Sequence, residues 1–290
     1  MMASAADAPD LPGLLREIFG FPEFRGMQRR VVDRVMAGQH SLAVMPTGAG
    51  KSLTYQLPSA ALPGTVIVIS PLIALMHDQL RSAQGVGIRA ATLTSADANR
   101  AETVDRLLRG ELDLLYVAPE RASQPWFRDL ISQVQLALFA IDEAHCVSEW
   151  GHDFRPDYRL LRPLLDHFPD TPRLALTATA DRHTRADILA QLGIGEDGLI
   201  VAGFDRPNIR YAIEPRAGLK AQLAELVKRI SGPGIIYAQT RDATERIAAG
   251  VAAAGRQVRV YHAGLPAEQR AANQAAFVAS EDMVMVATIA

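Results

Sequence analysis

Ser41-Leu-Ala-Val-Met-Pro-Thr-Gly-Ala-Gly-Lys-Ser52 is the stretch of this 290-residue chain that decides its fold. An apolar run leads into a glycine-rich turn and then into a helical pattern, which is the context of a phosphate-binding loop. The backbone amides of the turn and the dipole of the helix would face phosphates. Lys51 would reach the terminal phosphates, and the Ser52 hydroxyl would bind Mg²⁺. The turn itself consists of Thr47, Gly48, Ala49 and Gly50.

A glycine-rich turn from strand to helix that binds no ligand is the alternative interpretation. Met45 also stands where the full pattern has a glycine. The choice of basic residue favours the loop, because Lys51 is the one lysine among the first 219 residues of an arginine-rich chain. An ammonium is a compact charge that a guanidinium does not replace in a tight phosphate cradle.

The composition indicates a globular protein, with 49% hydrophobic and 21% charged residues. Disordered, collagen-like and coiled-coil proteins have different compositions. The single cysteine, Cys146, permits no internal disulfide and excludes a zinc site built from cysteines. Prolines interrupt the uncharged segment Ser52–Met76, so we expect helix, turn, strand and helix there and no membrane segment. The net charge of −2 provides no overall attraction to nucleic acid.

Short apolar runs alternate with amphipathic stretches, which predicts an α/β fold of parallel sheets covered by helices. We expect residues 1–10 to be a disordered tail, residues 11–202 a first domain and residues 203–290 a second. Expected strands are Ser41–Met45, Thr65–Ser70, Asp113–Val117, Leu136–Ile141, Arg173–Thr177, Gly234–Tyr237, Gln257–Tyr261 and Met283–Thr288. Expected helices are Arg25–Ala37, Leu72–Ala83, Ala98–Arg109 and Arg182–Leu192.

Two adjacent carboxylates, Asp142 and Glu143, follow the expected strand Leu136–Ile141. Asp142 would hold Mg²⁺, and Glu143 would orient or deprotonate the water that attacks the γ-phosphate. In isolation such a pair more often caps a helix. The phosphate-binding loop upstream favours the catalytic interpretation. His145 is either a packed polar residue or a relay.

Six motifs follow one another along the chain. They are Phe19-Gly-Phe-Pro-Glu-Phe-Arg-Gly-Met-Gln28, the phosphate-binding loop, Ser70-Pro-Leu-Ile-Ala-Leu-Met-His-Asp-Gln79, Tyr116-Val-Ala-Pro-Glu-Arg121, Asp142-Glu-Ala-His145 and Leu176-Thr-Ala-Thr-Ala180. In this order and spacing the chain resembles RecQ-type ATP-dependent DNA helicases of superfamily two, over residues 11–290. That family also has a methionine at the position of Met45. The resemblance implies two RecA-like P-loop NTPase domains.

The resemblance assigns Gln28 to the adenine edge, with Arg25 and Phe21 flanking the base. Phe21 stands where the family more often has tyrosine. Thr177 and Thr179 resemble the motif that links nucleotide state to the other domain. Their alternative role is ordinary hydrogen bonding at the end of a strand.

The segment Cys146–Tyr158 resembles the aromatic-rich loop by which RecQ helicases sense DNA. Aromatic rings stack on unpaired bases, and arginine adds a phosphate contact. The alternative is a hydrophobic plug, above all for Tyr158. RNA helicases of the Asp-Glu-Ala-Asp type lack this loop, so it favours DNA. The residues implied in DNA binding or coupling are Trp150, His152, Phe154 and Arg155.

In the second domain, Phe204–Asn208 resembles the family's hinge, while Ile235–Arg241 and Tyr261–Leu265 resemble its nucleic-acid-facing motifs. Thr240, Arg241 and His262 are therefore candidate DNA contacts, although Arg241 is equally a solvated residue at a helix start. Residues 284–290 resemble the start of the fifth motif. The rest of that motif, the sixth motif with its arginine finger, the zinc module and the winged helix do not follow. We therefore expect the second domain to be incomplete.

The resemblance implies ATP- and Mg²⁺-driven 3′-to-5′ translocation on DNA and duplex unwinding in recombination and repair, by closure and reopening of a cleft. We expect these residues to bind ATP and single-stranded or partly duplex DNA, to unwind poorly and to hold no zinc. The N-terminal segment has no signal-peptide pattern. A cytoplasmic location is expected, at the nucleoid if the protein is bacterial. Alternatives are an ATP- and DNA-binding module that does not hydrolyse, or an RNA-directed helicase of the same superfamily.

Overall fold

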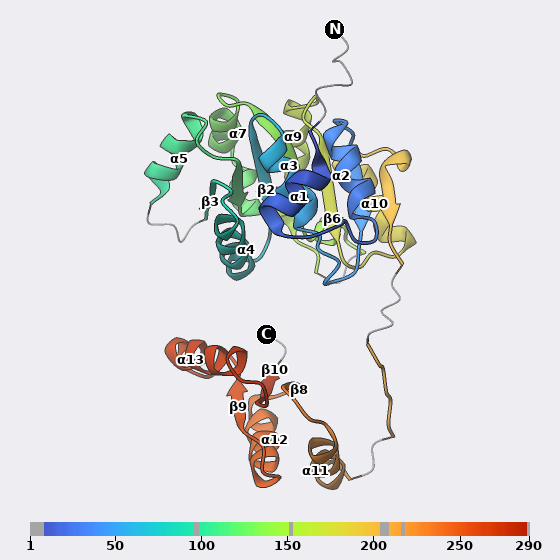
Figure 1. Cartoon of the computed structure of the whole chain (residues 1–290), viewed down its shortest axis with the longest axis vertical. Helices are drawn as coiled ribbons and strands as arrows, with labels where there is room; N and C mark the ends of the chain where they lie inside the picture. The colour runs from blue at the N-terminus through green and yellow to red at the C-terminus, as the bar shows by residue number, and fades with distance from the viewer. Residues whose placement is uncertain (1–8, 95–98, 151–152, 204–208, 216–217, 289–290) are drawn as a thin grey trace. The chain divides into compact units, whose positions relative to one another are not determined.

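The protein is described here from a computed structural model, which covers residues 9–94, 99–150, 153–203, 209–215 and 218–288. Contacts divide the chain into two compact units, Met1–Arg206 and Pro207–Ala290 (Figure 1). The division falls in the expected hinge Phe204–Asn208, which lies outside the described residues. The domain boundary expected at residue 202 therefore stays a prediction.

The first unit contains, within the described residues, a seven-stranded sheet in the order β3-β4-β2-β5-β6-β1-β7. Every pairing in it is parallel. Most positions of these strands are buried, because helices cover both faces. The strands are β1 Ser41–Val44, β2 Thr65–Ile69, β3 Ala90–Leu93, β4 Leu114–Val117, β5 Leu136–Ile141, β6 Arg173–Thr177 and β7 Leu199–Val201.

Alternate residues of each strand enter two separate hydrophobic cores, one on each face of the sheet. Helices α2 (Gln28–Met36), α3 (Leu53–Ala61) and α4 (Ile73–Gly85) cover one face. Helix α1 (Leu11–Phe19) packs on α2 and α3 through Leu15, Val32 and Leu57. The opposite face carries α5 (Arg100–Leu108), α6 (Pro119–Ala122), α7 (Pro125–Ile131), α8 (Pro156–Arg159), α9 (Leu161–His167) and α10 (Arg182–Leu192).

Parallel strands bring all their carboxyl ends to one edge of the sheet, where α/β proteins place ligand sites. Strand β6 lies between β1 and β5. The loops that follow β1, β5 and β6 are therefore neighbours, although more than 90 residues separate β1 from β5. This edge carries the phosphate-binding loop, the acidic pair and Thr177.

The second unit has, within the described residues, a three-stranded parallel sheet in the order β8-β10-β9. Its core contains Val227, Ala248, Val251, Val284 and Val286. The elements are α11 Leu219–Arg229, β8 Gly234–Ala238, α12 Arg241–Ala253, β9 Val258–Tyr261, α13 Ala267–Val278 and β10 Val284–Thr288.

The predicted fold class, an α/β fold of parallel sheets covered by helices, is confirmed. Leu136–Ile141, Arg173–Thr177 and Arg182–Leu192 have the expected bounds. The segment Ser52–Met76 forms the expected helix, turn, strand and start of a helix. No helix in the described ranges combines the length and apolarity that crossing a membrane requires.

Candidate functional site

The phosphate-binding loop connects β1 to α3 with two glycines in the left-handed region, Gly48 at φ +82° and Gly50 at φ +72°. These angles strain any residue with a Cβ atom. Within the described residues, the amides of Gly48, Gly50, Lys51 and Ser52 donate to no backbone or side-chain acceptor. Four free donors beside the first turn of a helix form an anion cradle, which fits the phosphates of a nucleotide. Thr47 and Ala49 complete the turn.

Lys51 lies at the end of this loop, half-buried, and its Nζ donates to the Met45 carbonyl oxygen at 3.2 Å. The ammonium therefore lies across the loop itself. Met45 is 1% exposed and its side chain belongs to the core beneath α2–α4. An apolar residue suits this position because the loop starts inside the core.

Gln28, the residue expected at the adenine edge, is buried at the start of α2. Its Oε1 accepts from the Arg25 amide at 2.9 Å, and its Nε2 donates to the Ala49 carbonyl at 2.9 Å. Nε2 also donates to the Gly50 carbonyl at 3.4 Å, so the carboxamide connects the segment before α2 to the phosphate-binding loop. Its Oε1 keeps the capacity to accept one more hydrogen bond. The Arg25 guanidinium lies 5.7 Å from the ring centroid of Phe21, which is 42% exposed.

Asp142 is 4% exposed at the end of β5. Its Oδ1 accepts from the Glu143 amide at 3.0 Å, and its Oδ2 accepts from Gln79 Nε2 at 3.5 Å. Burial raises the pKa of Asp142, the charge of Glu143 raises it further, and hydrogen bonds and Lys51 oppose the shift. Two neutral donors do not compensate a buried carboxylate fully, so the site suits a cation.

Glu143 is, in the described part of the chain, the one non-glycine residue with a left-handed backbone, at φ +48° and ψ +46°. Left-handed backbone in such a residue is often found at functional sites. The Glu143 side chain is 25% exposed, and its Oε2 lies 3.3 Å from His145 Nδ1. A short 3₁₀ turn, Ala144–Val147, follows it, so the acidic pair does not cap an α-helix.

His145 is 6% exposed, and its Nδ1 also lies 3.0 Å from Thr177 Oγ1 at the end of β6. The Thr179 amide donates to the same hydroxyl oxygen at 3.3 Å. The Met45 amide donates to the Thr177 carbonyl at 3.0 Å. Thr177 therefore contacts both His145, in the motif that contains the acidic pair, and the end of the strand that leads into the phosphate-binding loop.

Ser52 and Asp142 are the residues expected to bind Mg²⁺. Hydroxyl and carboxylate oxygens are the donors that Mg²⁺ prefers. Both belong to the same edge of the sheet, and Lys51 is near enough to Asp142 to lower its pKa. The oxygen donors and the incompletely compensated Asp142 carboxylate fit the ion.

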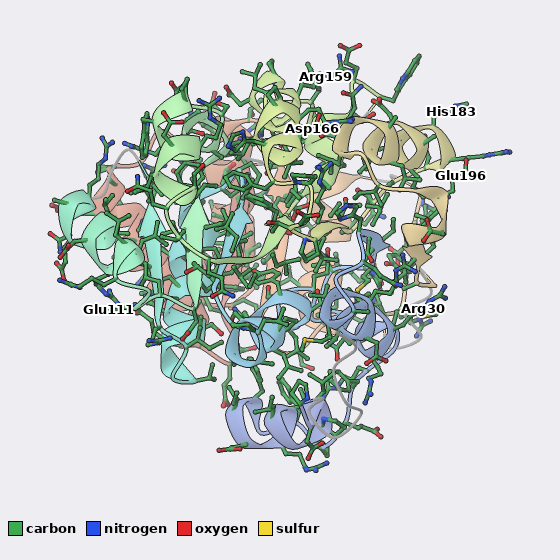
Figure 2. The ribbon with its side chains drawn as sticks, turned by 90° about the horizontal axis from the view of Figure 1, so that it is seen from above. Arg30, Glu111, Arg159, Asp166, His183 and Glu196 are labelled. Carbon is green, nitrogen blue, oxygen red and sulfur yellow. The ribbon has the colours of Figure 1, made fainter. Side chains whose placement is uncertain are left out.

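The aromatic segment after the 3₁₀ turn exposes Trp150, whose surface is 76% accessible. Arg155 anchors it: the Arg155 amide donates to the Cys146 carbonyl at 2.9 Å, and Nη1 donates to the Pro71 carbonyl at 3.3 Å. Phe154 lies against Arg159, whose guanidinium is 5.3 Å from the ring centroid. Figure 2 shows Arg159 at the periphery of the molecule. His152 lies outside the described residues.

Tyr158, for which both interpretations were open, is fully buried, and its hydroxyl donates to the Asp142 carbonyl at 2.9 Å. This tyrosine stabilises the backbone at Asp142. Its buried ring presents no surface on which a base could stack. Its contact shows how closely the aromatic segment and the carboxylates are connected.

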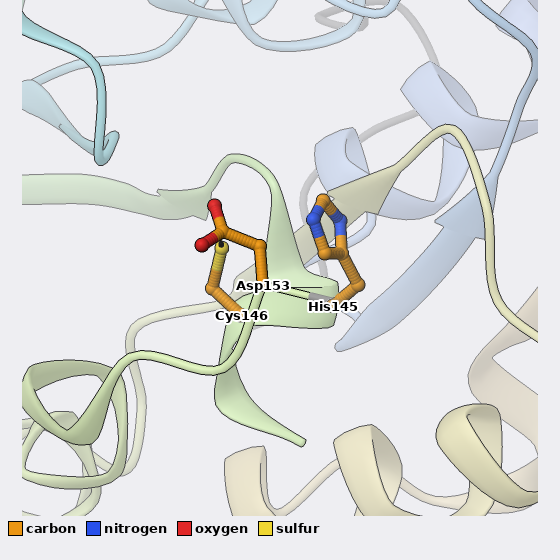
Figure 3. A group of neighbouring side chains, drawn as sticks. All are labelled: His145, Cys146 and Asp153. Atoms are coloured by element: carbon orange, nitrogen blue, oxygen red, sulfur yellow. Dashed lines mark hydrogen bonds between the residues drawn. The ribbon is translucent and has the colours of Figure 1, made fainter. Parts of the chain in front are cut away.

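His145, Cys146 and Asp153 offer three ligand-type atoms within 4.8 Å of one another (Figure 3). The Cys146 thiol donates to Asp153 Oδ2 at 3.9 Å. Burial, with the charge of Asp153 as the next cause, raises the pKa of Cys146 to about 12. A neutral buried thiol is a poor metal ligand, because the thiolate is the form that binds metals.

In the second unit, Thr240 and Arg241 begin α12, and the Thr240 hydroxyl caps that helix by accepting from the Ala243 amide at 3.1 Å. His262 is 6% exposed, and its Nε2 lies 3.1 Å from Glu245 Oε1. A Cβ placed on Gly264 would lie 3.1 Å from both Arg241 Cδ and His262 Nδ1. The structure thus brings Arg241 and His262 together around Gly264.

Sequence reasoning assigned no role to two residues beside the acidic pair, Tyr55 and Gln79. The Tyr55 hydroxyl donates to Gln79 Oε1 at 2.7 Å, and Gln79 is the residue that donates to Asp142. Gln79 belongs to the motif Ser70–Gln79, and that membership could have indicated a role for it. For Tyr55 the sequence indicated only a place in an expected helix.

A family model described as DEAD/DEAH box helicase matches residues 25–188. The ATP-dependent DNA helicase RecQ of Pasteurella multocida is 43% identical over 99% of this chain and 47% of its own length. RecQ of Haemophilus influenzae is 42% identical over 100% of this chain and 47% of its own length. The chain therefore spans about half the length of these curated relatives.

Solved structures of low sequence identity share the fold. The DUF1998 helicase MrfA, bound to DNA and AMPPNP, has a TM-score of 0.71 at 16% identity, over 99% of this chain and 44% of its own. Dbp5 of Saccharomyces cerevisiae has a TM-score of 0.69 at 17% identity, over 99% of this chain and 75% of its own. Both likenesses concern the fold.

The motifs identified in the sequence lie mostly within residues 25–188, and the similarity to RecQ helicases that they indicated is confirmed by the two bacterial relatives. This chain belongs to the DEAD/DEAH box helicase family.

Proposed function

We propose that this chain carries the ATP-hydrolysing machinery of a RecQ-type DNA helicase, and that it uses ATP and Mg²⁺. The observation that carries the proposal is the arrangement at one sheet edge, where a cradle of free amides with Lys51 adjoins the Asp142–Glu143 pair. The similarity to RecQ helicases supports the same activity.

In the proposed reaction the amides of the loop and Lys51 bind the phosphates of ATP. Ser52 and Asp142 would hold Mg²⁺, which would supply positive charge to neutralise the phosphates. Glu143 accepts a proton from water as the water oxygen bonds to the γ-phosphorus. The bond between that phosphorus and the bridging oxygen breaks, leaving ADP and inorganic phosphate. The contact with His145 orients one Glu143 oxygen and leaves the other for the water.

We propose that Gln28, Arg25 and Phe21 bind the adenine. Phe21 and Arg25 offer an exposed ring and a cation beside it, and Gln28 Oε1 can accept one more hydrogen bond. Because Gln28 also donates to Ala49, the contact with the base would reach the phosphate-binding loop through one side chain.

We propose that single-stranded DNA stacks on Trp150, with Phe154 and Arg155 alongside. His152 stays a candidate DNA contact from the sequence. An exposed indole on an anchored segment suits stacking, which contributes about 1–3 kcal/mol per base. The anchor also supports coupling, because Arg155 contacts the Cys146 carbonyl, three residues from Glu143. In the second unit, Thr240, Arg241 and His262 would contact the phosphate backbone.

Movement in the 3′-to-5′ direction and unwinding of duplex DNA are proposed for the whole protein from the RecQ resemblance. The decisive experiment measures phosphate release from ATP alone, with single-stranded DNA, and with RNA of the same sequence, for the wild type and Glu143→Gln. We expect stimulation by DNA above RNA, and loss of about 10²–10⁴-fold in rate with nucleotide binding kept in Glu143→Gln.

Three outcomes contradict parts of this proposal. Absence of hydrolysis with intact ATP binding supports a module that binds without hydrolysing. Stronger stimulation by RNA supports an RNA-directed helicase. The proposed direction is tested by strand separation with the whole protein. Unwinding of duplexes with a 5′ tail, and not of those with a 3′ tail, contradicts it.

A further inference from the structure

Two hydrogen bonds in the first unit connect α3, α4 and the end of β5. The Tyr55 hydroxyl of α3 donates to Gln79 Oε1 of α4 at 2.7 Å. Gln79 Nε2 in turn donates to Asp142 Oδ2 at 3.5 Å. Tyr55 is fully buried and Asp142 is 4% exposed, so both bonds lie where water competes little.

The first of these bonds sets the orientation of the Gln79 carboxamide. Its oxygen can only accept, so the tyrosine hydroxyl must donate, and the NH₂ end of the amide then faces Asp142. The reversed amide would place an oxygen against the carboxylate and leave a buried hydroxyl without its acceptor. Tyr55 therefore acts on Asp142 through Gln79.

Ser52 and Tyr55 are three residues apart at the start of α3, a spacing that puts side chains on one face of a helix. The helix that carries the Tyr55 hydroxyl therefore begins at one of the two residues expected to bind Mg²⁺. The hydrogen bonds through Gln79 lead from the same hydroxyl to the other, Asp142.

We propose that the Tyr55 hydroxyl and the Gln79 carboxamide are positioning groups that hold the Asp142 carboxylate in the orientation in which it serves one Mg²⁺ ion together with the Ser52 hydroxyl. The inference rests on the proposed function, and it gives roles to two residues outside the nucleotide and DNA contacts described above. Tyr55 and Gln79 themselves touch neither the ion nor the nucleotide in this proposal.

The physical reason is the orientation of the two oxygen donors. Ser52 begins a helix and Asp142 ends a strand that is not adjacent to β1, so no backbone hydrogen bond sets their relative positions. Mg²⁺ requires a nearly ideal octahedral arrangement of oxygens. Partners that orient ligands typically change metal affinity by about 10–100-fold when they are removed.

Tyr55→Phe tests the proposal by removing one oxygen while the ring stays in the core. Gln79→Leu removes the amide at similar volume. Ser59→Ala is the matched control, because Ser59 also carries a buried hydroxyl on α3, and that hydroxyl donates to the Gln56 carbonyl at 2.8 Å. Thermal unfolding of each variant establishes that it is folded.

Two measurements separate positioning from a general loss of structure. The first is the affinity for a fluorescent ATP analogue in EDTA and across a Mg²⁺ series. The second is binding of Mn²⁺, measured by electron paramagnetic resonance with a non-hydrolysable ATP analogue. We expect about a 10-fold rise in half-saturating metal for Tyr55→Phe and Gln79→Leu. Metal-free nucleotide affinity should stay within about twofold, and Ser59→Ala should match the wild type.

An unchanged metal requirement in either folded variant overturns the proposal, and so does an equal shift in Ser59→Ala. If Tyr55→Phe does not fold, Gln79→Leu alone decides. Failure of the proposed function gives a different result, because the wild type itself would then bind neither nucleotide nor metal with nucleotide.

Discussion

His145 Nδ1 lies 3.0 Å from Thr177 Oγ1. This contact joins the motif that follows β5, Asp142–His145, to the end of β6. Because Nδ1 is also 3.3 Å from Glu143 Oε2, one imidazole contacts both the proposed general base and the motif expected to report nucleotide state. A chain of three side chains thus connects Glu143 to the segment that follows β6.

Removing the Thr177 hydroxyl, and with it the contact to His145, should impair the coupling of DNA binding to ATP hydrolysis more than it impairs nucleotide binding. Thr177→Val keeps the buried shape and removes the hydroxyl, and a hydrogen bond of about 0.5–1.5 kcal/mol corresponds to a loss of about 2–10-fold in DNA-stimulated hydrolysis. Phosphate release with and without DNA measures it. Thr103→Val, a buried threonine of α5, is the control. Equal effects of the two substitutions would refute a specific role.

Lys51→Ala should lower the affinity for Mg-ATP by about 10–100-fold, because a hydrogen bond to a charged group contributes about 1.5–3 kcal/mol. The fold should remain, since within the described residues Lys51 Nζ makes its one hydrogen bond to the Met45 carbonyl. Isothermal titration calorimetry measures the affinity, with Lys220→Ala in the second unit as control. Unchanged ATP binding in Lys51→Ala would show that the phosphate-binding loop has been misassigned.

Gln28→Ala should reduce the preference for ATP over GTP more than it reduces affinity for triphosphate. The structure adds a second expectation: loss of the bonds to Arg25 and Ala49 should lower the free energy of unfolding by about 1–2 kcal/mol. Nucleotide competition and urea unfolding measure the two effects. Gln39→Ala, at an exposed position, should change neither. Full retention of purine selectivity would remove Gln28 from the adenine site.

Trp150→Ala should reduce DNA-stimulated hydrolysis far more than basal hydrolysis, without loss of stability, because the indole is 76% exposed. Loss of one stacked base corresponds to about 1–3 kcal/mol in DNA affinity. Arg155→Ala should behave similarly and also release the segment from Pro71. The control is Tyr211→Ala, an aromatic residue that is 81% exposed. Normal stimulation in both test variants would make the segment a structural plug.

Cys146 should react slowly with iodoacetamide in the folded protein. Its pKa is raised to about 12 by burial first, so at pH 8 the thiol is almost wholly protonated, and the thiolate is the reactive form. In urea the pKa returns to about 8.5 and the reaction should accelerate more than 100-fold. Mass spectrometry follows both rates. Rapid labelling at pH 8 without urea would show that the 3₁₀ turn opens readily.

Local signals in the sequence were sufficient for several elements and for the backbone conformation of the phosphate-binding loop. The apolar run Leu136–Ile141 and the amphipathic stretch Arg182–Leu192 have the predicted bounds, because a buried parallel strand and a half-buried helix leave period-dependent patterns. The glycines of the phosphate-binding loop were equally readable, since left-handed backbone at Gly48 and Gly50 requires that residue type.

The edge strands, the order of the strands and the contacts between distant side chains followed only from the tertiary structure, because the periodicity of the sequence does not encode them. The short edge strands β3 and β7 were not expected, because Ala90–Leu93 and Leu199–Val201 become strands through pairing with distant partners. The order of the strands places β6 between β1 and β5, which brings Thr177 to His145. Tyr158 was open to two interpretations until packing buried it beneath Asp142. The contacts of Tyr55, Gln79 and Asp142 span up to 63 residues, and such contacts arise from the packing of whole elements, which no local periodicity specifies.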